Sequence, residues 1–439
     1  MIKNSESFKL SMFNLYLKID ESTSGVYNTL HDSALVVDKD VLQTICETSM
    51  HGHDSFLEPL IENKMLVPHD FDEKQYFIYY LNKMKYSPVR ASYILTLTSS
   101  CNLDCPYCFE GRNKNGDTMS PVVAERALDY IIHQCEKNTS VKNVEIAFYG
   151  GEPLLNRDVM KFICEKASST LNNIVRLEYT LVSNLTLLMD SDIELLKHYS
   201  FTNIQVAIDG PPEIHDKRRI SKTGDKTFDL IFSNILKLVD NNLQVVLILN
   251  FDESSWHCYS DLIPIIKAQL PYKRMYLILN PLSKCLCNTS CGSTFSDNSK
   301  EAEIFLKLYN YFRDNDISIH AFGQDSVPCM LNRDMSEVID PKGLVYKCGL
   351  MLGKPEFAAG SIFDSLSRTF NYKMLLEEPW KQCLDRGCVY LPICGGGCRT
   401  RALIEAGDLS SLYCRKNDYY DHVYSILLRD HFKELIEGG

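Results

Sequence analysis

The chain has 439 residues but no apolar run that approaches the roughly 20 residues needed to cross a membrane. Its first seven residues are polar and lack the apolar core and small-residue cleavage site of a secretory signal. We therefore expect a cytoplasmic protein without a membrane partner. Disulfides are rare in that reducing compartment.

An excess of positive charge is also missing, because 46 Lys and Arg face 57 Asp and Glu, for a net charge of -11. Nucleic-acid phosphates are bound through clustered Lys and Arg, so this balance counts against a nucleic-acid partner. The 11 histidines form no HExxH pattern, and Gly395-Gly396-Gly397 lacks the Lys-Ser/Thr of a phosphate loop. Neither a zinc-protease motif nor a nucleotide loop is therefore predicted.

Cysteine, in contrast, is abundant, with 17 residues. So many thiols in a reducing compartment indicate metal or redox chemistry. Cys46, Cys135, Cys164 and Cys258 stand alone in predicted helices or near their starts. A free cysteine in such a place behaves as a small core residue, and we assign these four no function.

Three cysteines in one short loop carry the strongest signal. Cys101, Cys105 and Cys108 have the spacing C-x3-C-x2-C, directly after the strand-like run 93–98. Three thiolates can hold three irons of a 4Fe-4S cluster and leave the fourth iron open to a reagent. Bare CxxC pairs suit zinc or thiol–disulfide exchange, but three cysteines without a fourth nearby fit neither well.

Between residues 93 and 281, short apolar runs alternate with longer amphipathic ones, which predicts repeated βα units and a parallel sheet. We expect a partial (β/α)6 barrel of the TIM type, with a doubly wound open sheet as the alternative. Helices are expected at 121–137, with Ser120 as N-cap, and at 228–241. The expected strands are residues 93–98, 144–149, 177–182, 204–208, 245–250 and 275–279.

Several short polar or glycine-containing turns directly follow these strands. In a parallel barrel such turns meet at the C-terminal edge, where ligands bind. We therefore expect one shared mouth, formed by Cys101, Gly150-Gly151-Glu152, Ser183-Asn184 and Asp209-Gly210.

The flanking segments differ from this central pattern. The N-terminal one combines a strand-like run with two helices and a β-type run, an order that suggests a winged helix. The C-terminal one is rich in Gly, Pro and Cys before a final amphipathic helix. The predicted domains are a winged-helix-like domain at 1–90 (strand 13–19, helices 40–48 and 55–63, β-type run 65–68), the barrel at 91–316, and a cysteine-rich domain at 317–439 (helix 417–435).

The cysteine loop, together with Gly150-Gly151-Glu152 after the second strand, resembles the radical S-adenosylmethionine (SAM) superfamily. The resemblance implies that the three thiolates hold a 4Fe-4S cluster whose open iron is chelated by SAM. It also implies that the GGE turn holds the methionyl amino group of SAM. Tyr107, inside the cysteine loop, belongs by the same resemblance to the SAM-binding residues.

The run from Val206 to Arg219 resembles the fourth-strand region of the peptide- and protein-modifying branch of that superfamily. The resemblance implies that Asp209 lies at the mouth and that Arg219, rather than Arg218, pairs with the SAM carboxylate. The fork of an arginine suits a carboxylate. This chain has Ala207 where the family often has a serine.

Ser183 and Asn184 occupy the place of the family's Thr-Asn-Gly turn, which lies near the SAM ribose. Leu185 stands where that turn has its glycine.

The later cysteines, with glycines between Cys394 and Cys398, resemble the SPASM domain, a seven-cysteine module with two auxiliary 4Fe-4S clusters. Four residues separate Cys383 from Cys388 where that family usually has two. A zinc-binding fold is the alternative. The family's interleaved pattern implies a first auxiliary cluster on Cys329, Cys348 and Cys398, and a second on Cys383, Cys388, Cys394 and Cys414.

Seven thiolates leave the two auxiliary clusters one ligand short of eight. Gly323 stands where some relatives carry the eighth cysteine. Either one of Cys285, Cys287 and Cys291 completes the first auxiliary cluster, or a substrate thiolate occupies its open iron.

The resemblance implies an oxidoreductase with three 4Fe-4S clusters that cleaves SAM to a 5'-deoxyadenosyl radical. Our leading hypothesis is a maturase that forms a thioether or carbon–carbon crosslink in a ribosomally made peptide. A winged-helix-like domain resembles the element by which such maturases capture a leader through an added β-strand. The expected partners are a precursor peptide with its leader and a one-electron donor such as flavodoxin or ferredoxin.

Two alternatives remain. An anaerobic sulfatase-maturating enzyme forms formylglycine, but that family carries an aspartate after the cysteine matching Cys348, and this chain has Gly349. An iron–sulfur electron carrier is the non-enzymatic alternative, although it would not need the GGE and Asp-Gly-Pro turns. No catalytic base is assigned, because a base is placed only against a known substrate.

Overall fold

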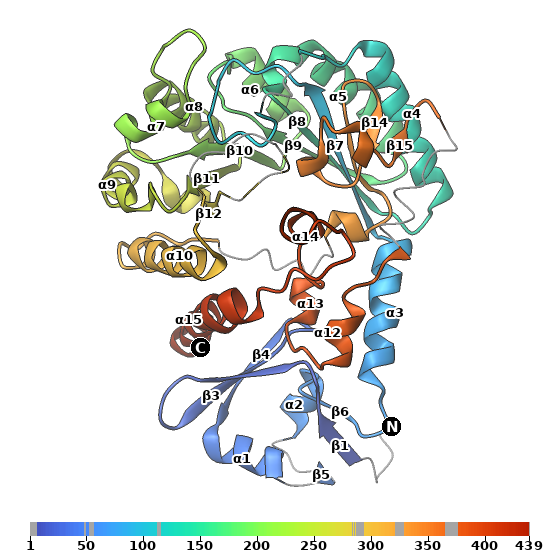
Figure 1. Cartoon of the computed structure of the whole chain (residues 1–439), viewed down its shortest axis with the longest axis vertical. Coiled ribbons are helices and arrows are strands. Elements are labelled where there is room, and N and C mark those ends of the chain that lie inside the picture. Colours follow the sequence, from blue (N-terminus) through green and yellow to red (C-terminus); the bar gives the residue numbers. More distant parts are fainter. Residues whose placement is uncertain are drawn as a thin grey trace. The chain divides into compact units, whose positions relative to one another are not determined.

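The computed structural model describes residues 7–47, 50–51, 57–111, 116–282, 284, 286, 294–320, 329–364 and 376–438. The chain separates into two compact units (Figure 1). The first unit comprises residues 1–84, 322–329 and 378–439, and the second comprises residues 85–321 and 330–377. Both units therefore combine segments that lie far apart in the sequence.

The second unit is built on a nine-stranded sheet with the order β12-β11-β10-β9-β8-β7-β13-β14-β15. The strands from β7 to β12 are parallel and neighbour one another in chain order. A doubly wound sheet reverses its strand order partway, so this succession excludes that alternative. The strands are β7 (Arg90–Thr98), β8 (Asn143–Gly150), β9 (Arg176–Val182), β10 (Asn203–Ile208), β11 (Val245–Phe251) and β12 (Tyr276–Pro281).

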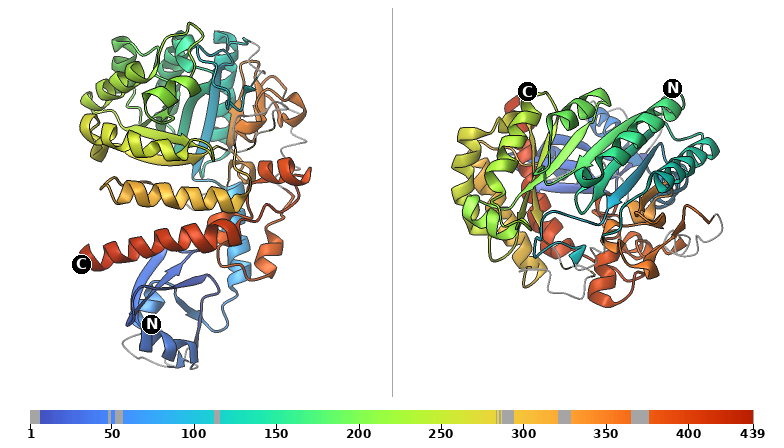
Figure 2. Two further views of the ribbon diagram at one scale, coloured as in Figure 1. Left: turned by 60° about the vertical axis from the view of Figure 1, so that its left-hand side comes forward. Right: turned by 90° about the horizontal axis from the view of Figure 1, so that it is seen from above.

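Helices connect these strands and lie on the outer side of the curved sheet (Figure 2, right). Ser120 begins α4 as predicted, since its hydroxyl accepts the Val123 N–H at 3.3 Å and Pro121 follows it. No helix in the described ranges is both long and apolar enough to span a membrane. The helices are α4 (Pro121–Lys137), α5 (Arg157–Leu171), α6 (Asp190–His198), α7 (Pro212–Arg218), α8 (Phe228–Asp240), α9 (Tyr259–Gln269) and α10 (Asn298–Arg313).

Three later strands extend the sheet beyond β7. Strand β13 (Ser336–Ile339) pairs with β7 in parallel, and β14 (Leu344–Tyr346) and β15 (Gly360–Ser361) follow in antiparallel order. All four residues of β13 are buried, as expected for a strand with neighbours on both sides. The sequence did not predict this extension.

The first unit contains two small antiparallel sheets, with the orders β5-β1-β6 and β2-β3-β4. The predicted strand at 13–19 forms as β2. The predicted C-terminal helix at 417–435 begins as a π-helix, Lys416–Tyr424, and continues as α15. The elements are β1 (Ser7–Leu10), β2 (Asn14–Lys18), β3 (Thr23–Asn28), β4 (Ser33–Asp38), β5 (Met50–His51), β6 (Leu66–Pro68), α1 (Lys39–Glu47), α2 (Glu58–Glu62), α3 (Glu73–Tyr86), α12 (Lys381–Asp385), α13 (Leu391–Cys394), α14 (Arg399–Ala406) and α15 (Ser425–Gly438).

Within this unit the first and last parts of the chain share one core. Tyr27 of β3 packs with Tyr390, Tyr424 and Phe432. A Cβ atom added to Gly25 would lie 2.6 Å from the Phe432 ring, so only glycine admits that ring against β3. The N-terminal sheet is therefore completed by the C-terminal helix.

Candidate active site

A cavity of about 550 Å³ lies at the C-terminal ends of strands β7 to β12. It brings together most of the residues that the sequence singled out after these strands, which agrees with the expectation of one shared mouth. Glu152 and Asp209 are not among its lining residues. The predicted residues that line it are Cys101, Cys105, Tyr107, Cys108, Gly150, Gly151, Ser183, Asn184 and Arg219.

Backbone hydrogen bonds fix the cysteine loop to the segment after α7. The Asp104 N–H donates to the carbonyl of Ile220 at 2.7 Å, and the Lys222 N–H donates to the carbonyl of Asn102 at 3.0 Å. The Asn102 side chain also donates to the Thr186 hydroxyl at 2.7 Å. Two neighbouring turns thus hold the loop in place.

The three thiols of this loop lie close enough to influence one another. Burial raises the pKa of Cys105 to about 11, and the nearby Asp209, Cys108 and Cys101 act in the same direction against Arg219. Burial thus disfavours the Cys105 thiolate, which a bound metal would stabilise.

In the described part of the chain, no group of three His, Cys, Asp or Glu side chains forms a site for a single metal ion. A 4Fe-4S cube is larger than one ion and holds its thiolates farther apart, so this finding is compatible with a cluster.

The two glycines after β8 are required by the backbone of the cysteine loop. A Cβ on Gly150, whose φ is +135°, would lie 2.3 Å from the carbonyl oxygen of Thr98. A Cβ on Gly151 would lie 2.2 Å from the carbonyl oxygen of Ser100. The two glycines are therefore in close contact with the backbone of this chain, at Thr98 and Ser100. This contact fixes the position of the loop that carries Cys101.

Glu152 joins the ends of β8 and β9. Its side chain has no exposed surface and accepts the Ser183 hydroxyl at 2.8 Å, the Asn184 N–H at 2.8 Å and the Leu154 N–H at 3.0 Å. Burial raises the pKa of this carboxyl against these three donors. Its side chain thus supports the turn that faces the cavity.

Asp209 is also buried, with no exposed surface. Its carboxylate accepts the Tyr107 hydroxyl and the Asn250 amide, the latter at 3.0 Å. The Asn250 side chain in turn accepts the Asn280 amide at 2.7 Å. The structure therefore places Asp209 behind Tyr107 rather than facing the cavity.

Asn250 and Asn280 both line the cavity, and the sequence analysis did not select them. Each lies at or directly after the end of a predicted strand. The other turns were selected because they follow predicted strands, and the same criterion would have selected these two asparagines.

The two adjacent arginines have different surroundings. Arg218 donates to Asp252 at 2.8 Å and lies 5.1 Å from the centre of the Tyr107 ring. Arg219 lines the cavity and donates to the Tyr107 hydroxyl at 3.1 Å, while its buried Nε atom has no hydrogen-bond partner among the described residues. Arg218 also has two buried nitrogens without a hydrogen-bond partner, Nε and one Nη, but only Arg219 lines the cavity and can reach a ligand there.

Leu185 adopts a left-handed backbone conformation, which favours glycine. Its φ is +60°, and its side chain is fully buried. The Asn234 amide donates to its carbonyl at 2.8 Å. A bulky residue in this region is strained, so its surroundings must hold it there.

Four of the later cysteines gather in the first unit. Burial raises the pKa of Cys383 to about 11, and the nearby Cys394, Cys388 and Cys414 act in the same direction. A Cβ on Gly397, whose φ is +85°, would lie 2.0 Å from the Tyr413 carbonyl oxygen, so glycine permits this tight turn. These four are the cysteines expected to bind the second auxiliary cluster.

The other later cysteines are divided between the two units. Cys398 and the exposed Cys329 belong to the first unit, whereas Cys348 belongs to the second. Cys285, Cys287 and Cys291 lie outside the described residues.

Comparison with known families identifies the central part of the chain. Residues 95–262 match the Radical SAM superfamily model, and the chain therefore contains a radical SAM domain. This stretch covers the cysteine loop and the turns after β8, β9, β10 and β11.

Three curated proteins are similar to this chain. It is 33% identical over 131 residues to the uncharacterized protein MJ0907 of Methanocaldococcus jannaschii, covering 30% of this chain and 42% of that protein. It is 25% identical over 331 residues to a cysteine-type anaerobic sulfatase-maturating enzyme of Clostridium novyi, covering 69% and 86%. It is 29% identical over 178 residues to the sporulation killing factor maturation protein SkfB of Bacillus subtilis, covering 40% and 39%.

Two solved structures share the fold. Native anSMEcpe with bound AdoMet and Kp18Cys peptide matches with a TM-score of 0.61 and 18% identity over 78% of this chain and 99% of that one. Streptococcus suis SuiB bound to precursor peptide SuiA matches with a TM-score of 0.56 and 14% identity over 93% and 99%. At these identities the likeness concerns the fold.

Proposed function

We propose that this chain is a peptide maturase that reductively cleaves SAM and oxidatively modifies a ribosomally synthesised peptide. The observation that carries the proposal is the convergence of three thiols, Gly150-Gly151 and Arg219 on one cavity of the radical SAM domain. When bound, the cluster and SAM would supply a 5'-deoxyadenosyl radical that removes a substrate hydrogen.

The residues of the cavity fit these cofactors. Cys101, Cys105 and Cys108 would hold the cluster, whose irons stabilise thiolates that burial alone disfavours. Arg219 would pair with the SAM carboxylate, because its partnerless Nε atom leaves part of a bidentate fork available. The other SAM-binding residues would be Tyr107, the GGE turn, Ser183 and Asn184, with Asp209 acting through Tyr107.

Two auxiliary 4Fe-4S clusters complete the proposal. The gathering of Cys383, Cys388, Cys394 and Cys414 supports the second of them. Cys329, Cys348 and Cys398 would hold the first, with either a cysteine from 285–291 or a substrate thiolate as its last ligand.

A peptide substrate is supported by the relatives, which include a maturation protein and sulfatase-maturating enzymes. The SuiB likeness covers 93% of the chain against 78% for anSMEcpe, which favours a maturase with an N-terminal recognition domain. That domain, residues 1–90, would capture the leader of a precursor peptide by β-strand addition. The peptide product would carry a thioether or carbon–carbon crosslink. A flavodoxin or ferredoxin would supply the electrons for reductive cleavage of SAM.

Formylglycine formation is the second candidate, because the match with the Clostridium novyi enzyme spans 86% of that protein. Gly349 counts against it, since the resemblance implies an aspartate at this position in that family.

The test begins with anaerobic reconstitution using iron and sulfide, followed by reduction in the presence of SAM. We expect 5'-deoxyadenosine from the native chain and none from the Cys101→Ala/Cys105→Ala/Cys108→Ala variant, which should keep its auxiliary iron. Absence of 5'-deoxyadenosine from the native chain would favour an iron–sulfur carrier.

The second step identifies the product. A short Cys-containing reading frame beside the gene would supply the peptide, and mass spectrometry should show the loss of two hydrogens. An unchanged peptide, together with conversion of a sulfatase peptide to formylglycine, would select the second candidate.

A further inference from the structure

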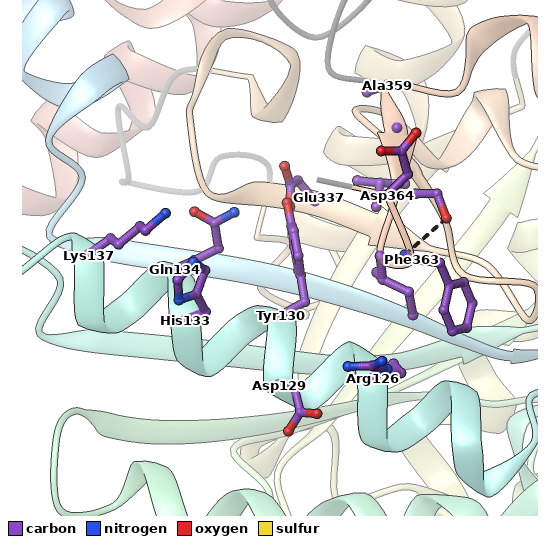
Figure 3. Close-up of a pocket in the computed structure, with 14 residues that line it drawn as sticks. Arg126, Asp129, Tyr130, His133, Gln134, Lys137, Glu337, Ala359, Phe363 and Asp364 are labelled. Atoms are coloured by element: carbon purple, nitrogen blue, oxygen red, sulfur yellow. Dashed lines mark hydrogen bonds between the residues drawn. The ribbon is translucent and has the colours of Figure 1, made fainter. Parts of the chain in front are cut away.

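A second cavity, of about 620 Å³, lies in the radical SAM unit between α4 and the β13–β15 extension. None of its lining residues lines the cavity that holds the cysteine loop. Helix α4 contributes one face, from Arg126 to Lys137, and Tyr130 and Glu337 lie between this helix and the extension (Figure 3).

Glu337, on β13, lines this cavity although only 1% of its surface is exposed. Its carboxylate accepts the Tyr130 hydroxyl at 2.7 Å, and no ion pair joins it to a Lys, Arg or His side chain of the described residues. A buried carboxylate without a cation is destabilising, because its lost hydration is not replaced. Glu337 thus has the surroundings of a group that lacks a positively charged partner.

The neighbouring strand adds a second buried polar group. Tyr93 of β7 is the register partner of Glu337, so both side chains point to the same face of the sheet. The Tyr93 hydroxyl is buried and has no hydrogen-bond partner among the described residues. The Tyr93 hydroxyl is therefore a second buried polar group beside Glu337.

The walls of the cavity suit the apolar stem of a basic side chain. Val345 and Ala359 are buried apolar residues, and Phe363 is 54% exposed. The Tyr130 and Phe363 rings present aromatic faces or edges on which a cation can also rest. A ligand with an alkyl chain and a positive head would contact both kinds of surface.

The exposed rim carries both signs of charge. Arg126, His133 and Lys137 of α4 oppose a free cation, whereas Asp129 and Asp364 favour it. Exposed charges are screened by salt, while the charge of buried Glu337 is screened much less. Arg126, His133 and Lys137 can also pair with carboxylates of a ligand. The cavity therefore fits a basic residue with acidic neighbours in a peptide better than it fits a simple polyamine.

We infer that this cavity is a docking subsite for a lysine or arginine side chain of the peptide substrate, with Glu337 as its anchor. The inference rests on the proposed function for the identity of the peptide, but not for the chemistry of the subsite. The alkyl stem would lie against Phe363 and Val345, and the ammonium or guanidinium group would donate to Glu337.

The test uses reconstituted protein and the probe Nα-acetyl-L-lysine N-methylamide, with the norleucine analogue as the matched uncharged probe. Hydrogen–deuterium exchange should show protection at 126–137 and 336–346 with the lysine probe alone. Glu337→Gln keeps an acceptor for Tyr130 and should weaken the affinity for lysine about tenfold or more. Tyr130→Phe should weaken it less.

Glu145→Gln is the control variant, because Glu145 already pairs with Arg90 at 3.3 Å and accepts from Thr180 at 3.1 Å. It should lower the melting temperature and keep the lysine response, whereas Glu337→Gln should be at least as stable as the native chain. Equal protection by both probes, an undiminished response in Glu337→Gln, or unfolding of that variant would overturn the subsite.

SAM binding by the same preparations separates this inference from the proposed function. A native chain that binds SAM but not lysine refutes the subsite alone. A chain that binds lysine but not SAM refutes the proposed function and leaves the subsite standing.

Discussion

The hydroxyl of Tyr107 donates a hydrogen bond to the buried carboxylate of Asp209, and it accepts one from Arg219. Tyr107 therefore connects a carboxylate that no ligand reaches with an arginine that faces the cavity. The Asp209 carboxylate thus fixes the position of Tyr107, and the Tyr107 hydroxyl fixes the position of Arg219.

We predict that Asp209→Asn weakens recognition of the SAM carboxylate without contacting it. The native chain should bind SAM about tenfold or more tightly than decarboxylated SAM, because a bidentate arginine–carboxylate contact is strong. In Asp209→Asn this ratio should fall severalfold, as measured by equilibrium dialysis of the reconstituted protein. Asp252→Asn is the control, since it removes the other carboxylate that pairs with Arg218 and leaves the hydrogen bonds of Tyr107 to Asp209 and Arg219 in place. An equal loss of affinity for both ligands in Asp209→Asn would indicate a structural role only.

Gly151→Ala should disrupt the cysteine loop. The added Cβ would lie 2.2 Å from the Ser100 carbonyl oxygen, so the backbone before Cys101 must move. We expect loss of most SAM binding together with about one cluster's iron. Gly349→Ala, which meets no atom within 4 Å, should bind SAM like the native chain. Normal SAM binding by Gly151→Ala would contradict this account.

Two substitutions of Leu185 separate the effect of backbone strain on stability from the effect of side-chain burial. Leu185→Ala loses the buried side chain and keeps a Cβ at a φ of +60°, and we expect a cost of about 2–5 kcal/mol in the free energy of unfolding. Leu185→Gly loses the same contacts but relieves about 1 kcal/mol of backbone strain. Urea denaturation should therefore find the glycine variant the more stable of the two, and the reverse order would show that the backbone is unstrained.

The buried His215 should make stability fall in acid. Burial lowers the pKa of His215 from 6.5 to about 3. As the pH falls, the unfolded chain therefore binds a proton at this histidine while the folded chain does not. This contribution is complete above about pH 6.5 and is lost as the pH falls toward 3, by roughly 1.4 kcal/mol per unit.

His215→Asn keeps an acceptor for the Asp209 N–H, which lies 3.3 Å from Nδ1, and it removes the titration. Urea denaturation of iron-free protein between pH 7.5 and 5.0 should show a smaller acid loss in this variant. Identical slopes for both proteins would refute the assignment.

The sequence predicted the parallel strands well because each is a short apolar run between turns. All six form, and their ends differ from the predicted ends by about three residues at most. Residues placed directly after a strand, such as Cys101 and Gly150, were predicted to converge and do so. That inference needs only the local pattern and the direction of parallel strands.

Features that depend on distant segments were not predicted. Strand β13 pairs with β7 across more than 200 residues, and β15 has only two residues, so neither leaves a periodic signal. The partners of Asp209 were not predicted either, because Tyr107 and Asn250 come from other strand ends. Sequence position showed that Asp209 was near the mouth but not which way its carboxylate pointed.

The packing of Gly25 against Phe432 has a consequence for synthesis of the protein. Residues 1–84 are synthesised before α15. The sheet of β2, β3 and β4 therefore lacks part of its core until α15 has been made. The radical SAM strands, which follow one another in sequence, can assemble earlier because domains fold as they are synthesised. The sheet of β2, β3 and β4 is therefore among the last parts to become stable, since its core is complete only after α15 has been synthesised.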